Sequence, residues 1–155
     1  MASSSVTILG GGNTAFSVAA NLQLAGTEVT LCELPAFEET LAPLRETRSI
    51  SLKGVARTGV TELNEVTSDL SSAIPKNEFL LLIVPAYAQR AFGEAMVSYL
   101  REGQTIVLMP GNLGSLELSC ILDRHQKRDI TLAETDTAPY VCRKTEPDTA
   151  HIWGV

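Results

Sequence analysis

Three consecutive glycines, Gly10–Gly12, separate two segments of contrasting pattern near the start of the chain. The segment before them, Val6–Leu9, is a short run of β-branched and other apolar side chains, which is typical of a buried strand. The segment after them, 13–25, has apolar side chains at helical spacing and is followed by Gly26, a residue type that commonly ends helices. The sequence therefore predicts a strand, a tight glycine turn and a helix in direct succession.

The turn matches the pattern GxGxxA, which is typical of dinucleotide-binding folds, at Gly10, Gly12 and Ala15. Gly10 permits a tight turn out of the strand, Gly12 lets a pyrophosphate approach the backbone, and Ala15 lets the helix pack closely on the sheet. The backbone N–H groups at the start of the helix, at Asn13 and Thr14, then point toward the phosphates, whose charge the helix dipole favours. No lysine is needed for this mode of binding.

A second predicted strand, Glu28–Cys32, ends directly before Glu33, which lies 23 residues after Gly10. An acidic residue about 20 residues beyond the glycine motif binds the adenosine ribose in many such folds. A carboxylate there would repel a 2′-phosphate, so we expect NAD(H) in preference to NADP(H). Two alternatives stay open: Glu33 is a solvated residue after an ordinary glycine turn, or Arg45 and Arg48 fold back to accept a 2′-phosphate.

The rest of the chain continues the alternation of strands and helices, and Phe79–Val84 has the unbroken apolar character of a central parallel strand. Further strands are predicted at 105–109 and 129–133, helices at 37–47, 86–100 and 116–122, a weak helical turn at 68–73, one or two small strands at a sheet edge around Gly54 and Gly59, and a terminal hairpin or two edge strands at 140–143 and 149–153. This alternation predicts one α/β domain over residues 1–155, with a Rossmann-like, doubly wound, mainly parallel sheet and helices on both faces.

Composition narrows the class of protein. The 155 residues carry a formal net charge of −6 and 45% of them are hydrophobic, as in an ordinary globular domain. An acidic chain is unsuited to coating nucleic acid or an anionic membrane, because both need clustered Lys and Arg. The longest apolar run is far shorter than the roughly 20 residues of a membrane span, and residues 1–5 lack the features of a signal peptide. We expect a cytoplasmic protein in which Cys32, Cys120 and Cys142 are reduced, mostly buried thiols.

Ligands of open α/β sheets bind beyond the carboxyl ends of the strands, so the loops at those ends are candidate binding segments. The loop residues expected to contact the dinucleotide are Val84, Pro85, Ala86, Pro110 and Gly111. The residues expected on the substrate side are Gln89, Asn112, Thr135, Asp136 and Tyr140. Alternatively, the prolines only end strands, and the acidic residues of the last loop are solvated or cap backbone amides. Neither His125 nor His151 has the neighbours of a hydrolase triad, and no metal-ligand spacing is present.

Taken together, these motifs resemble the NAD(P)-binding domain of the octopine/nopaline (opine) dehydrogenase family over nearly the whole chain. The resemblance rests on Ile8–Asn13, Val84–Ala86, Gly103–Val107 with Pro110–Gly111, and Ala133–Tyr140 with Arg143. The last of these is the most particular to the family. The resemblance implies an NAD(P)H-dependent oxidoreductase acting on CH–NH bonds, in which an amino acid and a 2-oxo acid form an imine that the nicotinamide reduces.

The resemblance also implies a second, mostly helical domain that carries the acid/base histidine and its carboxylate partner. The chain ends at Val155, where that domain would begin, and no histidine here matches the catalytic one. Relatives commonly have a histidine in the loop where this chain has Gln89, and a glutamine cannot shuttle a proton. We therefore expect a cofactor-binding domain that is inactive alone, with an exposed apolar patch where the helical domain docks, and that can form a homodimer.

Three alternatives stay open. The chain is a stand-alone Rossmann domain that senses a dinucleotide for regulation and needs no catalytic half. It is an N-terminal domain similar to that of glycerol-3-phosphate dehydrogenase, although that family lacks the closing motif at 133–140. Or it is a complete small reductase whose catalytic residue is Tyr87, Glu134 or Asp136, although its substrate would then have only one wall to bind against.

Overall fold

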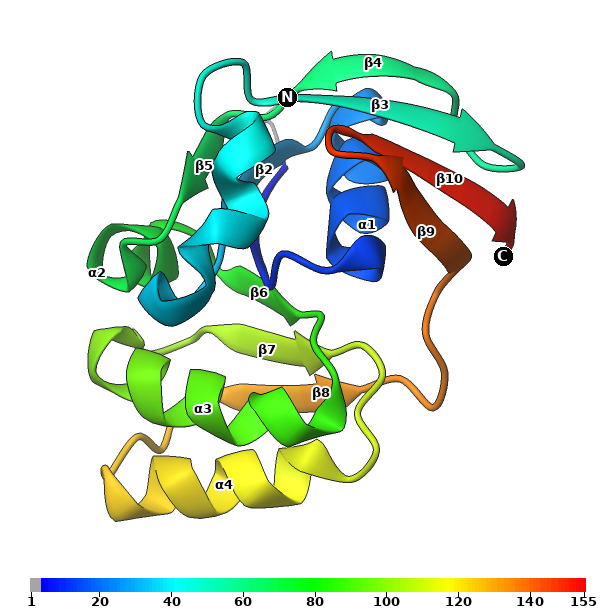
Figure 1. Ribbon diagram of the computed structural model, residues 1–155. Coiled ribbons are helices and arrows are strands. Elements are labelled where there is room, and N and C mark those ends of the chain that lie inside the picture. Colours follow the sequence, from blue (N-terminus) through cyan, green and yellow to red (C-terminus); the bar gives the residue numbers. More distant parts are fainter. Residues whose placement is uncertain (1–3) are drawn as a thin grey trace.

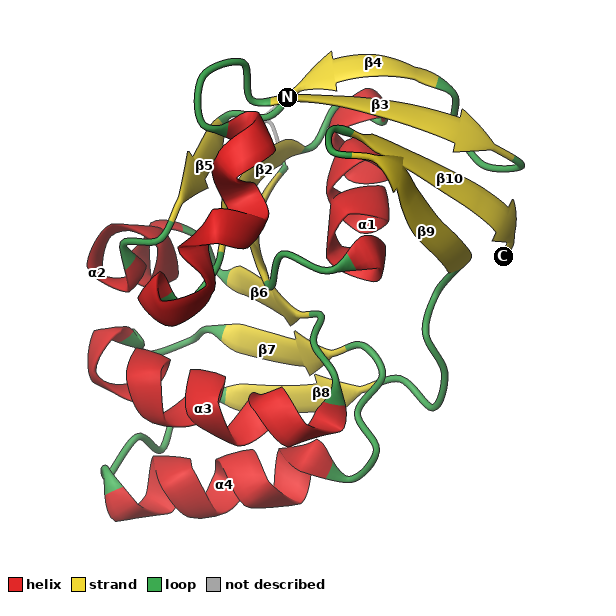
Figure 2. Ribbon diagram, in the orientation of Figure 1, coloured by secondary structure: helices red, strands yellow, loops and turns green. Residues whose placement is uncertain are grey.

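The computed structural model describes residues 4–155, which form two β-sheets with helices between and around them (Figure 1). Figure 2 distinguishes the helices from the strands. The strands are β1 (Ser5–Leu9), β2 (Glu28–Cys32), β3 (Ser49–Gly54), β4 (Gly59–Glu62), β5 (Glu65–Thr67), β6 (Phe79–Leu82), β7 (Thr105–Leu108), β8 (Thr131–Glu134), β9 (Val141–Glu146) and β10 (Thr149–Gly154). The α-helices are α1 (Asn13–Leu24), α2 (Leu70–Ala73), α3 (Ala86–Met96) and α4 (Gly114–Arg124), and the 3₁₀ segments are η1 (Pro35–Leu44), η2 (Ile74–Lys76) and η3 (Val97–Tyr99).

The larger sheet has six parallel strands in the order β5-β2-β1-β6-β7-β8. Pairing aligns Leu9 of β1 with Cys32 of β2 and with Leu82 of β6, so these three strands end side by side. From β1 the chain moves outward in one direction through β2 and β5, and then in the other direction through β6, β7 and β8. This reversal of strand order is the topological switch point of a Rossmann-like sheet, and the predicted fold class is confirmed.

Helices pack on both faces of the larger sheet, as the sequence predicts. Alternate residues of β1 enter different cores: Ile8 lies in a cluster with Phe16 of α1, whereas Leu9 lies in a cluster with Phe92 of α3 and Leu118 of α4. Burial on both faces explains why the central strands are almost continuously apolar. Across residues 4–155, every helix falls short of the length and apolar character that crossing a membrane requires.

The second sheet, in the order β4-β3-β10-β9, covers the outer side of α1 (Figure 1). The predicted terminal hairpin is confirmed, because β9 and β10 pair antiparallel. The small strands predicted around Gly54 and Gly59 are β3 and β4; β4 lies at an edge, as expected, but the edge belongs to this second sheet, because β3 pairs with β4 and β10. Ile50 and Leu52 of β3 are fully buried in the cluster that contains Phe16 of α1, so this separate sheet completes the core on that face.

Two segments differ from the sequence-based prediction. The segment 37–47, expected to be an α-helix, is instead the 3₁₀ segment η1, with non-helical dihedral angles at Phe37 and with Pro43 inside it. A proline at that position has no N–H to donate to an α-helical hydrogen bond. The three-residue strand β5 was not predicted, since its edge position and its length give only a weak apolar pattern.

The cysteines also differ from expectation. Cys32 is buried and Cys142 is half-buried, but Cys120 is exposed, so the prediction of mostly buried thiols is wrong for Cys120. Burial raises the pKa of the Cys32 thiol to about 12, and the nearby negative charge of Glu33 adds to this effect. The Cys32 thiol is therefore protonated and unreactive at neutral pH.

Candidate functional site

The carboxyl ends of β1, β2 and β6 border a cleft of about 400 Å³ at the switch point of the larger sheet. Its lining includes Gly12 from the glycine turn, Glu33 from the end of β2, and Val84 and Pro85 from the end of β6. An adjoining cleft of about 320 Å³ shares Gly12, Val84 and Pro85 and extends to Pro110 after β7. The tertiary structure therefore brings together most of the loops that the sequence predicts for the dinucleotide.

The glycine turn has the geometry that the sequence predicts for Gly10 and Gly12. Gly10 has φ of +125°, and a Cβ added there would lie 2.5 Å from the carbonyl oxygen of Ile83. At Gly12, by contrast, an added Cβ would meet no atom within 4 Å, so that side of the turn is open. The open side fits a cofactor phosphate lying against the backbone. Ala15 is fully buried between the helix and the sheet, as expected.

Gly11, which occupies the variable position of the motif, is also sterically restricted. A Cβ at Gly11 would overlap the hydroxyl oxygen of Thr40 and come within 3.1 Å of the carboxylate of Glu33. The sequence reasoning missed this restriction, since the neighbours belong to η1 and to the end of β2. The third glycine therefore allows these two segments to pack against the turn.

Glu33 is not a solvated residue, so that alternative is wrong: it is only 7% exposed, and its carboxylate faces the glycine turn. One oxygen accepts a hydrogen bond from the N–H of Gly11 at 2.7 Å, and the other accepts one from the N–H of Leu34 at 2.7 Å. Burial raises the pKa of Glu33 above its usual range, although both N–H groups and the charge of Lys144 oppose the rise. Each carboxylate oxygen still has a lone pair with which to accept a further hydrogen bond.

The side chains at the start of α1 connect this helix to β9. The amide oxygen of Asn13 accepts a hydrogen bond from the backbone N–H of Lys144 at 2.9 Å, and the thiol of Cys142 lies 3.8 Å from the hydroxyl of Thr14. The first hydrogen bond within the helix runs from the N–H of Phe16 to the carbonyl of Gly12. The backbone N–H groups of Asn13 and Thr14 precede that bond, so these amides are the ones available to an anion.

Lys144 is a member of the site that the sequence did not indicate. Its side chain lines the same cleft as Glu33, donates a hydrogen bond to the carbonyl of Gly11 at 3.0 Å, and lies over the ring of Phe16 at 4.0 Å from the ring centroid. Burial lowers the pKa of Lys144, and the charge of Glu33 partly offsets this. Strand alternation turns Lys144 toward α1 while its neighbour Arg143 is exposed, and only the pairing of β9 reveals this.

The two arginines that could have accepted a 2′-phosphate are paired elsewhere. Arg45 donates to Glu39 at 3.1 Å within the segment that contains η1, and Arg48 forms an ion pair with Glu62 of β4. Neither arginine lines the cleft that contains Glu33.

The loop after β7 is held from both sides. Gln89 of α3 is only 1% exposed, and its amide donates a hydrogen bond to the carbonyl of Pro110 at 2.9 Å. The N–H of Gly111 bonds the carbonyl of Thr135 at 2.9 Å, and the carboxylate of Glu134 accepts from the N–H of Ser115 in the first turn of α4 at 3.1 Å. Gln89 thus orients the loop, and its role toward a substrate stays a prediction. The alternative that Glu134 caps backbone amides is supported by its geometry.

The other substrate-side candidates are not brought together. Asn112 is exposed with φ of +51°, and Asp136 is exposed in the loop after β8. The hydroxyl of Thr135 donates to the carbonyl of Thr137 at 2.8 Å. The hydroxyl of Tyr140 accepts a hydrogen bond from Asn21 of α1 at 2.8 Å, so Tyr140 belongs to the contact between α1 and the second sheet. Their roles toward a substrate remain predictions.

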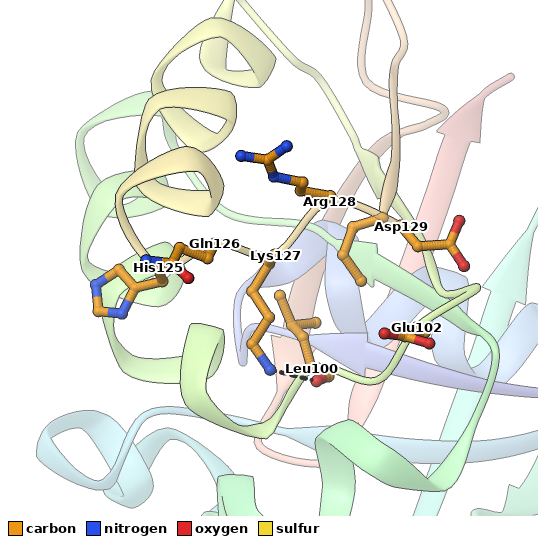
Figure 3. A pocket seen from close by; sticks show the side chains of 8 residues that line it. Leu100, Glu102, His125, Gln126, Lys127, Arg128 and Asp129 are labelled. Carbon is orange, nitrogen blue, oxygen red and sulfur yellow. Dashed lines mark hydrogen bonds between the residues drawn. The ribbon is translucent and has the colours of Figure 1, made fainter.

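A further hollow of about 320 Å³ lies between the segments that precede β7 and β8 (Figure 3). It is lined by polar side chains that include His125, Lys127 and Arg128, and the ammonium of Lys127 donates to the carbonyl of Leu100 at 2.7 Å. These segments enter the amino ends of the strands, whereas ligands of such sheets bind at the carboxyl ends. The switch-point cleft is therefore the candidate site.

Known proteins share sequence similarity with this chain over most of its length. No family model matches the chain. An opine dehydrogenase of Arthrobacter sp. (strain 1C) is 30% identical over 141 residues, which cover 90% of this chain and 39% of that protein. A vitopine synthase of Allorhizobium ampelinum (strain ATCC BAA-846 / DSM 112012 / S4) is 28% identical over 155 residues, which cover 98% of this chain and 42% of that protein. The chain thus spans roughly two fifths of the length of these relatives.

Solved structures agree with the sequence relatives on the fold. Octopine dehydrogenase in complex with NADH and agmatine has a TM-score of 0.87 and 22% identity, over 99% of this chain and 40% of that chain. Yersinopine dehydrogenase with NADP⁺ bound has a TM-score of 0.79 and 21% identity, over 98% of this chain and 39% of that chain. In sequence the chain is similar to opine dehydrogenases, and in fold it matches the N-terminal Rossmann-like domain of octopine dehydrogenase.

Proposed function

We propose that the chain binds NAD(H) at the switch-point cleft, as the cofactor-binding part of an opine-dehydrogenase-like oxidoreductase. The observation that carries this proposal is the carboxylate of Glu33, held by the N–H of Gly11 next to the open side of Gly12. The adenosine ribose hydroxyls donate to Glu33, and the pyrophosphate accepts from the backbone N–H groups of Asn13 and Thr14. The loops after β6 and β7 then border the nicotinamide half.

Two observations support a preference for NAD(H) over NADP(H). Glu33 places a buried negative charge where a 2′-phosphate would approach, and two like charges at close range repel strongly in a partly desolvated cleft. Arg45 and Arg48, which could have neutralised that phosphate, are paired with other carboxylates. A yersinopine dehydrogenase of the same fold has been solved with NADP⁺, so both cofactors belong in the test.

For the whole protein we propose reductive condensation of an amino acid with a 2-oxo acid. Octopine dehydrogenase has been solved with NADH and L-arginine and with NADH and pyruvate, which are an amino acid and a 2-oxo acid. The bound nicotinamide supplies the hydride that reduces the imine to a secondary amine. In this proposal the chain binds and orients the cofactor, whereas a mostly helical partner domain supplies the acid/base groups, so residues 1–155 alone turn over little. We also propose a cytoplasmic location and a homodimer.

The direct test is a fluorescence titration of NADH and NADPH with the 155-residue chain. Gly12→Val places methyl groups in the space open to the pyrophosphate, so NADH affinity is expected to fall more than about 10-fold without loss of folding. Gly154→Val is the matched control, because a Cβ at Gly154 makes only ordinary contacts with Val141 of the second sheet. Equal NADH affinity in the wild type and in Gly12→Val would falsify the phosphate-binding assignment.

A second measurement tests the division of labour between domains. The wild-type chain, with NADH, pyruvate and an amino acid, is expected to show no more than background oxidation of NADH, because proximity and acid/base groups are missing. Robust turnover by the chain alone would contradict the need for a helical domain and would favour a complete small reductase.

A further inference from the structure

Among residues 4–155, Lys144 is the one lysine whose side chain lines the switch-point cleft. Lys144 belongs to the strand β9, near the C-terminal end of the described residues. Its backbone N–H donates a hydrogen bond to the amide oxygen of Asn13, which positions its backbone at the start of α1. Its ammonium lies over the buried ring of Phe16, 4.0 Å from the ring centroid, and donates a hydrogen bond to the carbonyl of Gly11. The cation is thus held at the glycine turn itself, not on a mobile surface side chain.

The ammonium of Lys144 has donors to spare. It has three N–H groups, of which the structure assigns one to the carbonyl of Gly11. Within residues 4–155, none of the ion pairs includes Lys144. Its burial disfavours the charged form, as the lowered pKa shows, and Glu33 only partly offsets this. A half-buried cation without a paired anion, facing a cleft, is expected to bind an anionic ligand group.

The charge balance of the cleft also favours a contact between Lys144 and a bound phosphate. A pyrophosphate brings negative charge toward the buried carboxylate of Glu33, and the helix N-terminus offers only about half a positive charge to oppose it. Lys144 supplies a full charge close enough to oppose part of the rise in the pKa of Glu33 that burial causes. Resting on the proposed function, we infer that the ammonium of Lys144 donates a charge-assisted hydrogen bond to a phosphate oxygen of the bound dinucleotide, so that the phosphate is held by a side chain as well as by helix amides.

The phosphate in question is either the pyrophosphate or, in NADP(H), the 2′-phosphate, since both lie near the adenosine ribose. Lys144→Met tests the contact, because methionine keeps an unbranched side chain of similar length but removes the charge. Lys127→Met is the matched control: Lys127 is also half-buried and also donates to a backbone carbonyl, that of Leu100, but at the opposite end of the strands. The probes are adenosine, ADP, NADH and NADPH, titrated into the 155-residue chain.

Loss of one charge-assisted hydrogen bond is expected to weaken binding of phosphate-bearing probes to Lys144→Met by about 10-fold or more, while adenosine binds as to the wild type. The slope of log affinity against log salt concentration should also become shallower, by the amount expected for the loss of about one ionic contact. Equal losses for ADP, NADH and NADPH assign the contact to the pyrophosphate, and a loss confined to NADPH assigns it to the 2′-phosphate. Lys127→Met is expected to match the wild type for every probe.

Two results would overturn the inference. Unchanged affinity of Lys144→Met for ADP, NADH and NADPH shows that the lysine makes no phosphate contact. An equal loss for adenosine and for ADP shows that the variant has only distorted the cleft. Failure of the proposed function is distinguishable from both, because the wild-type chain then binds none of the dinucleotides.

Discussion

Replacing Gly10 and Gly12 separately by alanine is expected to damage two different properties. At Gly10, φ of +125° lies outside the regions that alanine readily adopts, and such a conformation costs about 1–3 kcal/mol. The added Cβ would also lie 2.5 Å from the carbonyl oxygen of Ile83 and 2.9 Å from a methyl group of Val84, and overpacking of this kind costs about 1–3 kcal/mol more. Gly10→Ala should therefore lose about 2–6 kcal/mol of its free energy of unfolding.

Gly12→Ala should behave in the opposite way. Gly12 has ordinary dihedral angles of −81° and −178°, and an added Cβ has no neighbour within 4 Å. The stability cost is the poorer helix cap that alanine makes, at most about 1 kcal/mol. The new methyl group instead occupies the open side of the turn, so NADH affinity should fall while the melting temperature stays close to that of the wild type.

Thermal and urea unfolding followed by circular dichroism measure the first effect, and NADH fluorescence titration measures the second. A domain is stable by only about 5–15 kcal/mol, so Gly10→Ala should lower the melting temperature by more than about 5 °C. The reasoning is refuted if Gly10→Ala melts with the wild type, or if Gly12→Ala is the less stable of the two variants.

Three further predictions address other parts of the molecule. Burial raises the pKa of Glu33, and protonation removes an acceptor for the ribose hydroxyls, so NADH affinity should fall as the pH is lowered through that raised value. The variant Glu33→Gln should bind NADH weakly and with an affinity that does not change with pH. A pH-dependent affinity in Glu33→Gln would contradict this prediction. Alkylation of the folded chain followed by mass spectrometry should modify the exposed Cys120 and spare Cys32, whose pKa is about 12, and the reverse order would be inconsistent with the fold. Gln89→Leu leaves the carbonyl of Pro110 without its donor and should cost about 1–3 kcal/mol in urea unfolding, whereas an unchanged midpoint would show that the bond does not stabilise the loop.

Local pattern was sufficient where neighbouring residues decide the structure. The strand and helix around the glycine turn, and the apolar strand beginning at Phe79, follow from spacing alone, and the structure has them within two residues of the predicted ends. The position of Glu33 at the end of β2 follows from the same spacing. The separate sheet formed by β3, β4, β9 and β10 could not be inferred, because the sequence of a short strand does not specify which other strand it pairs with.

The sequence by itself therefore determined the Rossmann-like fold, the glycine turn and the acidic residue after it, because each depends on side-chain size, charge and spacing over a few residues. Only the tertiary structure decided the rest of the site. Lys144 is 133 residues away from the carbonyl it contacts, and Gly11 is restricted by Thr40 of η1. Gln89 proved to be a buried support for the loop after β7. Such contacts depend on how strands and helices pack, and packing follows from long-range burial, which spacing along a chain does not encode.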